Sequence, residues 1–171
     1  MKSLTDQLAQ YASYHRDQRN VWTHFVGIPM IVLSVATLLS RWSVLSLPIG
    51  SAGMELTVAA LVSAVMAVFY LRLDLRYGLV MSGLLALACT EGSSLAQGSV
   101  LHWLAWGLGL FLVGWIIQFL GHYFEGRKPA FVDDLIGLAI GPLFVVAELG
   151  FLLGWRPEVH QAVISRAGAL R

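Results

Sequence analysis

The sequence predicts an all-α fold, a polytopic bundle of transmembrane helices forming one integral-membrane domain over residues 1–171. The composition supports this: 57% of the residues are hydrophobic and the mean hydropathy is +0.72. Only 12% are charged, against about 25% in an average soluble domain. Long apolar stretches recur along the chain, and Trp22 and Trp42 flank the first of them, as in the aromatic belts of membrane helices.

The first 20 residues are polar and amphipathic. Leu4, Leu8 and Tyr11 recur at helical spacing with polar residues between them, which predicts a short helix over residues 4–14. We expect residues 1–20 to form an interfacial segment at the membrane surface. The apolar stretch that follows exceeds the core of a signal peptide, so we expect it to remain as a membrane span.

Five transmembrane spans are predicted, at about residues 21–40, 55–73, 77–90, 100–124 and 135–155. Twenty helical residues extend about 30 Å, one hydrocarbon thickness. Asn20 is a candidate N-cap for the first span, and RWSVLSLPIGSAGM after it is predicted to be a turn. The third span is short and precedes a Gly/Ser-rich break, EGSSLAQGS, so in an alternative with four spans residues 77–90 are re-entrant.

Basic residues gather on one side of the membrane in the five-span topology. That side holds seven of the eleven Lys and Arg residues, namely Lys2, Arg16, Arg19, Arg72, Arg76, Arg127 and Lys128. The positive-inside rule makes this side, with the N-terminus, cytoplasmic, in a bacterial inner membrane or the endoplasmic reticulum. The four-span alternative would divide these residues. They form no single patch, so no nucleic-acid partner is expected, and the sequence leaves the oligomeric state open.

The same side collects residues that can bind a metal. His15 and His24 flank the start of the first span, and His122 lies near the end of the fourth, so segments a hundred residues apart can meet there. Gln118, His122 and Glu125 form one polar stripe at helical spacing. Helical bundles build metal sites from imidazoles and carboxylates in this way, and these ligands suit iron(II), zinc or manganese.

Further polar residues have expected supporting roles. Hydrogen bonds from Tyr14, Asn20 or Gln118 would orient the metal ligands. Arg127 and Lys128 have two possible functions: contact with phospholipid headgroups, or binding of the carboxylate of an acidic substrate.

Two stretches of the chain resemble a known family of small polytopic membrane proteins. They are YASYHRDQRNVWTHFVGIP, residues 11–29, and GWIIQFLGHYFEGRKPA, residues 114–130. A third stretch, GPLFVVAEL, has Gly141 where the family has Ala. The family's characterised fungal member is the iron(II)-dependent 2-hydroxy-fatty-acid dioxygenase of phytosphingosine breakdown.

The resemblance implies α-oxidation, in which a 2-hydroxy fatty acid reacts with O2 and is shortened by one carbon. Its implied cofactor is Fe(2+), and its implied partners are a fatty acyl substrate, O2 and membrane lipid. We assign His15, His24 and His122 as metal ligands, and Glu125 as a fourth ligand or an orienting base. In this assignment Glu125, Arg127 and Lys128 form the catalytic group.

Two other functions fit the same residues. Histidines on facing helices also hold haem, and the chain could be a lipid-binding membrane protein without catalysis, its histidines structural. A transporter is disfavoured, because no internal repeat suggests alternating access.

Overall fold

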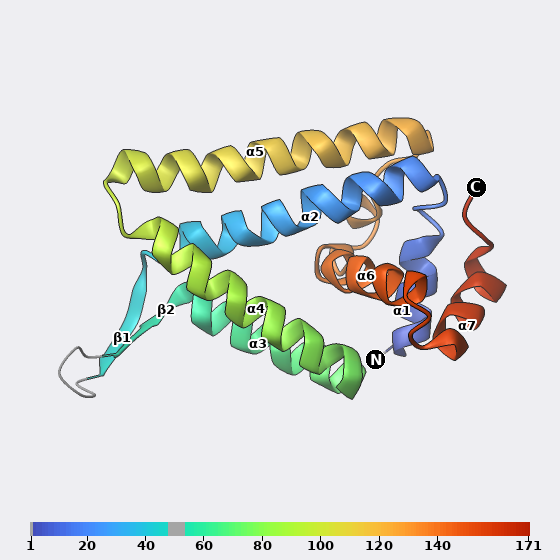
Figure 1. Ribbon diagram of the computed structural model, residues 1–171, viewed down its shortest axis with the longest axis horizontal. Coiled ribbons are helices and arrows are strands. Elements are labelled where there is room, and N and C mark those ends of the chain that lie inside the picture. Colours follow the sequence, from blue (N-terminus) through green and yellow to red (C-terminus); the bar gives the residue numbers. More distant parts are fainter. Residues whose placement is uncertain (1, 48–53) are drawn as a thin grey trace. The chain divides into compact units, whose positions relative to one another are not determined.

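The computed structural model describes residues 2–47 and 54–171, and 77% of the chain is helical (Figure 1). The predicted all-α class is confirmed. The described elements, in order, are α1 (Leu4–Ala12), α2 (Gln18–Leu39), β1 (Ser43–Leu47), β2 (Met54–Thr57), α3 (Val58–Leu73), α4 (Leu75–Ala96), α5 (Val100–Glu125), the 3-10 helix η1 (Ala130–Val132), α6 (Gly137–Leu152) and α7 (Pro157–Ala167).

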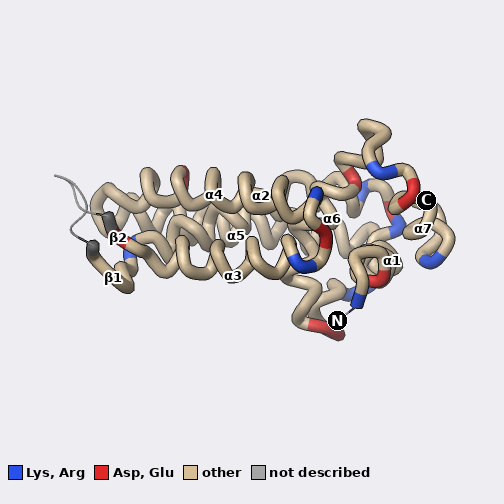
Figure 2. The backbone as a smooth tube through the Cα atoms, turned by 90° about the horizontal axis from the view of Figure 1, so that it is seen from below, with Lys and Arg blue, Asp and Glu red and all other residues tan. Residues whose placement is uncertain are grey.

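Three helices within the described ranges are long and apolar enough to cross a membrane: α2, α4 and α5. Figure 2 shows that these helices carry few charged residues along their length. A fourth crossing is possible if α6 and α7 count as one broken span, and α3 is apolar but has only 16 residues. The chain therefore has the helices of a membrane protein, while the count of five spans stays a prediction.

The connection after α2 differs from the predicted turn. β1 and β2 pair as an antiparallel hairpin, and its residues 48–53 lie outside the described part of the chain. The Pro and Gly residues of this stretch favoured a turn, but the apolar segments on either side of them extend and pair. The second predicted span is shortened as a result, because α3 begins only at Val58, where Thr57 Oγ1 accepts a hydrogen bond from the Ala60 N–H at 3.2 Å.

The predicted break after residue 90 is wrong. α4 continues through the Gly/Ser-rich stretch to Ala96 and has 22 residues, enough for a full span. Tertiary packing overrides the weak helix propensity of these residues: a Cβ on Gly92 would stand 2.8 Å from the Ala36 carbonyl carbon of α2. Ser93 Oγ also donates to Ser40 Oγ at 3.2 Å.

The predicted fifth span, residues 135–155, is a shorter helix followed by a bend. α6 ends at Leu152, and α7 leaves it at 115°. The backbone turns at Gly154 and Arg156, which have positive φ angles of 74° and 57°, and Pro157 opens α7. The sequence did not predict α7.

The chain divides into two compact units, residues 1–29 with 114–171 and residues 30–113. Every residue of the predicted site belongs to the first unit. There α1 packs against α6 and α7, and its side chains Leu8 and Tyr11 share a buried core with Ile140 and Phe144. In the second unit, α3 and α4 lie side by side (Figure 1).

The start of α2 corrects one prediction. Asn20 is not the N-cap, because the helix begins two residues earlier, at Gln18. Asp17 takes that role: its carboxylate accepts a hydrogen bond from the Arg19 N–H at 2.9 Å. Asn20 is thereby placed inside the first turn of α2, where its side chain is fully buried.

Candidate metal centre

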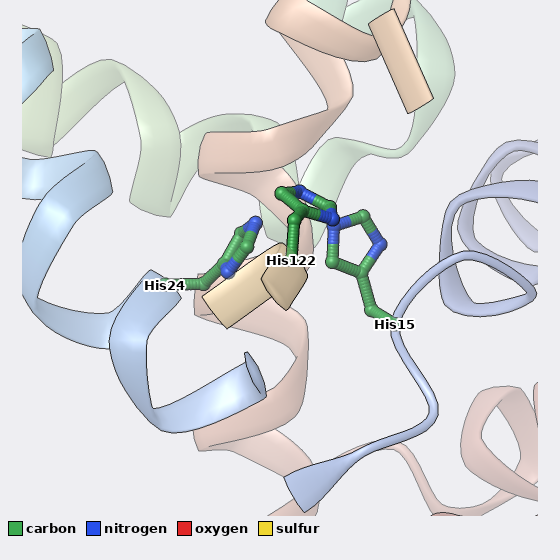
Figure 3. Close-up of side chains that lie close together, drawn as sticks. All are labelled: His15, His24 and His122. Atoms are coloured by element: carbon green, nitrogen blue, oxygen red, sulfur yellow. The ribbon is translucent and has the colours of Figure 1, made fainter. Parts of the chain in front are cut away.

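Three histidines meet in one buried cluster (Figure 3). The ring centroids of His15 and His24 are 4.5 Å apart. The centroid of the His122 ring lies 5.0 Å from that of His15 and 5.2 Å from that of His24. One ring nitrogen from each residue falls within 4.8 Å of the other two. The side chains come from the turn after α1, the start of α2 and the end of α5, so the structure brings together the three imidazoles that the sequence singled out.

Two of the imidazoles are oriented in the same way. Nδ1 of His15 lies 2.7 Å from the Tyr11 carbonyl oxygen, and Nδ1 of His24 lies 2.8 Å from the Asn20 carbonyl oxygen, four residues back in each case. A carbonyl only accepts, so Nδ1 carries the proton in both rings. The lone pair of each ring is therefore on Nε2, which is free to bind a metal.

The cluster leaves buried ring nitrogens without partners. His15 Nε2 and His122 Nδ1 are both buried and unbonded within the described residues. Such an orphaned group costs about 1–3 kcal/mol, so its presence calls for an explanation. Burial also holds the pKa of His15 well below its usual range, with the neighbouring His24 as a further cause, so this ring stays neutral near pH 7. Neutral imidazole nitrogens facing one another fit a divalent transition metal.

Two aromatic residues complete the surroundings of His15. The Tyr11 ring stacks on it with centroids 4.1 Å apart and an interplanar angle of 7°, and Phe144 of α6 lies 5.6 Å away. Neither residue was predicted from the sequence to belong to the site. The spacing of Tyr11, one helical turn before His15, was the available signal for the first. Phe144 lies in the stretch GPLFVVAEL that resembles the family, but its contact with His15 depends on how α6 packs against α1.

Glu125 lies beside the cluster and has a different set of partners. Its Oε2 accepts hydrogen bonds from the N–H groups of Arg16 at 2.9 Å and Asp17 at 2.7 Å, and from the Asn20 side-chain amide at 3.1 Å. The carboxylate is therefore turned toward the backbone that carries His15. It does not belong to the three-residue ligand group, so the geometry favours an orienting role over a fourth ligand.

The three predicted supporting residues have different surroundings in the structure. Asn20 lies at the site, since its carbonyl orients His24 and its amide donates to Glu125. Gln118 is buried one turn before His122, and its Nε2 has no partner within the described residues. Tyr14 instead points to Asp133, to which its hydroxyl donates at 2.9 Å.

Arg127 and Lys128 lie in the loop after α5 with partners of their own. The Arg127 guanidinium donates to the Ser13 carbonyl at 2.8 Å and stands 4.6 Å over the Tyr14 ring. Lys128 pairs with Asp133 at 2.6 Å. Both basic side chains therefore line the exposed end of the unit that holds the cluster, and their binding of a substrate carboxylate stays a prediction.

These features define a class of protein: a helical protein with membrane-type spans and a buried cluster of three histidines. The comparison with known families is more specific. The chain belongs to the family described as 2-hydroxy-palmitic acid dioxygenase Mpo1-like, whose model matches residues 1–153. The resemblance noted in the sequence is thus confirmed.

A curated relative supports the same family. The chain is 34% identical over 158 residues to the 2-hydroxy-palmitic acid dioxygenase MPO1 of Saccharomyces cerevisiae, an alignment that covers 91% of this chain and 84% of the yeast protein. The match to a protein of that name supports membership in a family of 2-hydroxy fatty acid dioxygenases, which are oxidoreductases. No solved structure matches it.

Proposed function

We propose that the protein is an iron(II)-dependent dioxygenase that shortens 2-hydroxy fatty acids by one carbon. The observation that carries the proposal is the buried cluster of His15, His24 and His122, in which a nitrogen on each of two rings has no hydrogen-bond partner among the described residues. Membership in the dioxygenase family supports the reaction, and the name of the yeast relative supports the substrate class.

The donor set would hold iron through Nε2 of His15, Nε2 of His24 and Nδ1 of His122. Iron(II) bound there would supply the binding and reduction of O2. Three neutral imidazoles leave the charge of a divalent ion uncompensated, since Glu125 is engaged with backbone donors. The site therefore favours an anionic substrate, and the carboxylate of a 2-hydroxy acid meets that requirement.

The reaction balances with one O2 for each substrate molecule. The bond between C1 and C2 breaks, C1 leaves as CO2, and C2 becomes the carboxyl carbon of the shortened acid. O2 accepts the four electrons that C1 and C2 lose, and one water is formed. The protein's own groups prepare this step. The Tyr11 and Asn20 carbonyls hold two rings in position, and Tyr11 with Phe144 shields His15 from water.

The proposal is tested with protein purified without oxygen. We expect it to retain about one iron per chain and to consume O2 when 2-hydroxypalmitate is added, with a product one carbon shorter by mass spectrometry. His122→Ala should abolish both iron retention and O2 uptake. His102→Ala, an exposed histidine on the same helix, is the matched control and should keep both.

Wild-type O2 uptake by a normally expressed His122→Ala protein would refute the assignment. A Soret band in the wild-type protein would instead support haem binding. A protein without metal or turnover would support the lipid-binding alternative.

We further propose that the cluster lies at the cytoplasmic end of the spans. His24 near the start of α2 lies beside His122 near the end of α5, which supports a topology with both helix ends on one side of the membrane. If α4 and α5 cross as a hairpin, α3 must then carry the chain back across, and its 16 residues extend about 24 Å. The basic residues on the cluster's side are then Lys2, Arg16, Arg19, Arg72, Arg76, Arg127 and Lys128, joined by Arg166 and Arg171, which pair with Asp6 and Glu125.

Labelling of single cysteines tests this topology. In a Cys89→Ser background, a membrane-impermeant thiol reagent should label Ser43→Cys in sealed, right-side-out membranes. It should label Lys2→Cys only after the membranes are opened. The reverse pattern would place the cluster on the outer side.

A further inference from the structure

The last described segment, Gly168–Arg171, lies against the turn that carries His15, which is residues 13–17 between α1 and α2. The Arg171 N–H donates to the Arg16 carbonyl at 2.7 Å, and the Arg171 carbonyl accepts from the Gln18 N–H at 3.2 Å. The two bonds pair this segment with the turn in the manner of a short β-bridge. The turn itself is neither helix nor strand, so it depends on partners from elsewhere in the chain.

Side chains strengthen the same contact. The Arg16 guanidinium donates to the Ala169 carbonyl at 3.0 Å, and the Arg171 guanidinium lies 3.5 Å from Glu125 Oε1. Gly168 makes this approach possible. Its φ of 84° is unfavourable for other residues, and a Cβ there would stand 2.6 Å from Arg16 Nη2.

The N–H groups of three successive residues show how the turn is held. Those of Arg16 and Asp17 donate to Glu125, and that of Gln18 donates to Arg171. Neither of the two acceptors, the Glu125 carboxylate and the Arg171 carbonyl, belongs to the turn itself. Glu125 secures one half of the turn from α5, and Arg171 secures the other half from beyond α7.

The segment is also anchored at its base. α7 packs against α1, and Arg166 of α7 pairs with Asp6 of α1. The match to the family model ends at residue 153, so α7 and Gly168–Arg171 lie outside it.

We propose that Gly168–Arg171 is a strap that positions the turn so that His15 completes the metal site. The inference rests on the proposed function, because it takes the cluster to be a metal site. Without the strap, the Gln18 amide and the Arg16 carbonyl lose their partners and the turn opens more often. His15 then leaves the cluster transiently, and an ion held by the remaining two histidines dissociates more easily.

The experiment measures how fast Co²⁺ leaves the protein to a chelator, using detergent-purified full-length chain. Co²⁺ is a spectroscopic substitute for iron(II) that needs no turnover. Two variants remove the strap's contacts: a chain that ends after Ala167, and Gly168→Ala. We expect both to release Co²⁺ at least about tenfold faster than wild type, since several hydrogen bonds that hold the turn closed are lost.

Gly154→Ala is the matched control. Gly154 also has a positive φ, 74°, but a Cβ there meets nothing among the described residues within 4 Å, so the substitution strains the backbone without touching the strap. It should release Co²⁺ at the wild-type rate even where its thermal midpoint falls as far as that of Gly168→Ala. Equal release rates in wild type and both strap variants would overturn the proposal. So would fast release from Gly154→Ala at a matched midpoint, because general loosening would then explain the effect.

Hydrogen exchange separates this proposal from the proposed function. In metal-free protein, the amides of residues 16–18 should exchange faster in Gly168→Ala than in wild type, and unchanged exchange would again overturn the strap. If wild-type protein binds no Co²⁺ or iron, the proposed function fails, while the exchange measurement still tests the strap.

Discussion

Replacing Glu125 with Gln tests whether this carboxylate orients the site or binds the metal. The substitution keeps the shape of the side chain and removes its charge. In the structure, Oε2 accepts three hydrogen bonds, from Arg16, Asp17 and Asn20, and the side chain is only 2% exposed, so water does not screen them.

The expected loss follows from those three bonds. A hydrogen bond to a charged group contributes about 1.5–3 kcal/mol and a neutral one about 0.5–1.5 kcal/mol, a difference of roughly 1 kcal/mol for each bond. Glu125→Gln should therefore lower the free energy of unfolding by about 3 kcal/mol. Iron should still bind with the same stoichiometry, because the three histidines remain.

The assay combines denaturant unfolding of the metal-free protein in detergent with metal analysis of the loaded protein. Glu91→Gln, on the exposed side of α4, is the control and should change stability by no more than about 0.5 kcal/mol. An unchanged free energy of unfolding together with lost iron would refute the reasoning and make Glu125 a ligand.

Two further predictions address the helix contacts around the site. Gly121→Ala should destabilise the protein by about 1–2 kcal/mol and weaken metal binding, because the added Cβ would overlap Thr23 Oγ1 and stand 2.5 Å from Asn20 Oδ1. Gly109→Ala on the same helix, where a Cβ meets nothing within 4 Å, should be neutral or stabilising in the same unfolding assay. For Asp6, hydrogen bonds from the Ser3 hydroxyl and Ser3 N–H, and then the charge of Arg166, hold its pKa below the ordinary value of 3.8. Its contribution to stability is therefore present above pH 3.8 and lost as the pH falls through the lowered pKa, so the stability difference between wild type and Asp6→Asn should be clear at pH 7 and vanish in acid. A difference that persists unchanged at low pH would contradict this origin.

The convergence of the three histidines could be predicted because it depends on coarse features. The number of apolar stretches predicts in which direction each helix crosses the membrane. His24 lies near the start of one long helix and His122 near the end of another, so both are expected on the same side. Periodicity then places them on the polar side. The length of a helix and the side of the membrane on which it ends depend on summed hydrophobicity, which the sequence displays directly.

The details that were missed depend on individual tertiary contacts. Gly92 and Ser93 have weak helix propensity, and only their contacts with α2 reveal why α4 continues through them. The role of Glu125 is similar. Helical spacing placed it on the face of His122, but its partners Arg16 and Asp17 belong to a turn whose path no periodicity describes. Local pattern therefore predicted which residues come together, and packing decided which partners hold each of them.

The three histidines differ in how their positions are secured, and this explains where sensitivity to mutation should lie. His24 and His122 are part of long helices, so hydrogen bonds within each helix fix their backbones. His15 stands in a turn outside the helices, where its N–H donates to the Ala12 carbonyl at 3.0 Å. Its ring is held by the Tyr11 carbonyl, and the backbone after it by Glu125. Groups far away in the sequence should therefore control metal retention through His15, and changes in the middle of α2 or α5 that leave the packing intact should matter less.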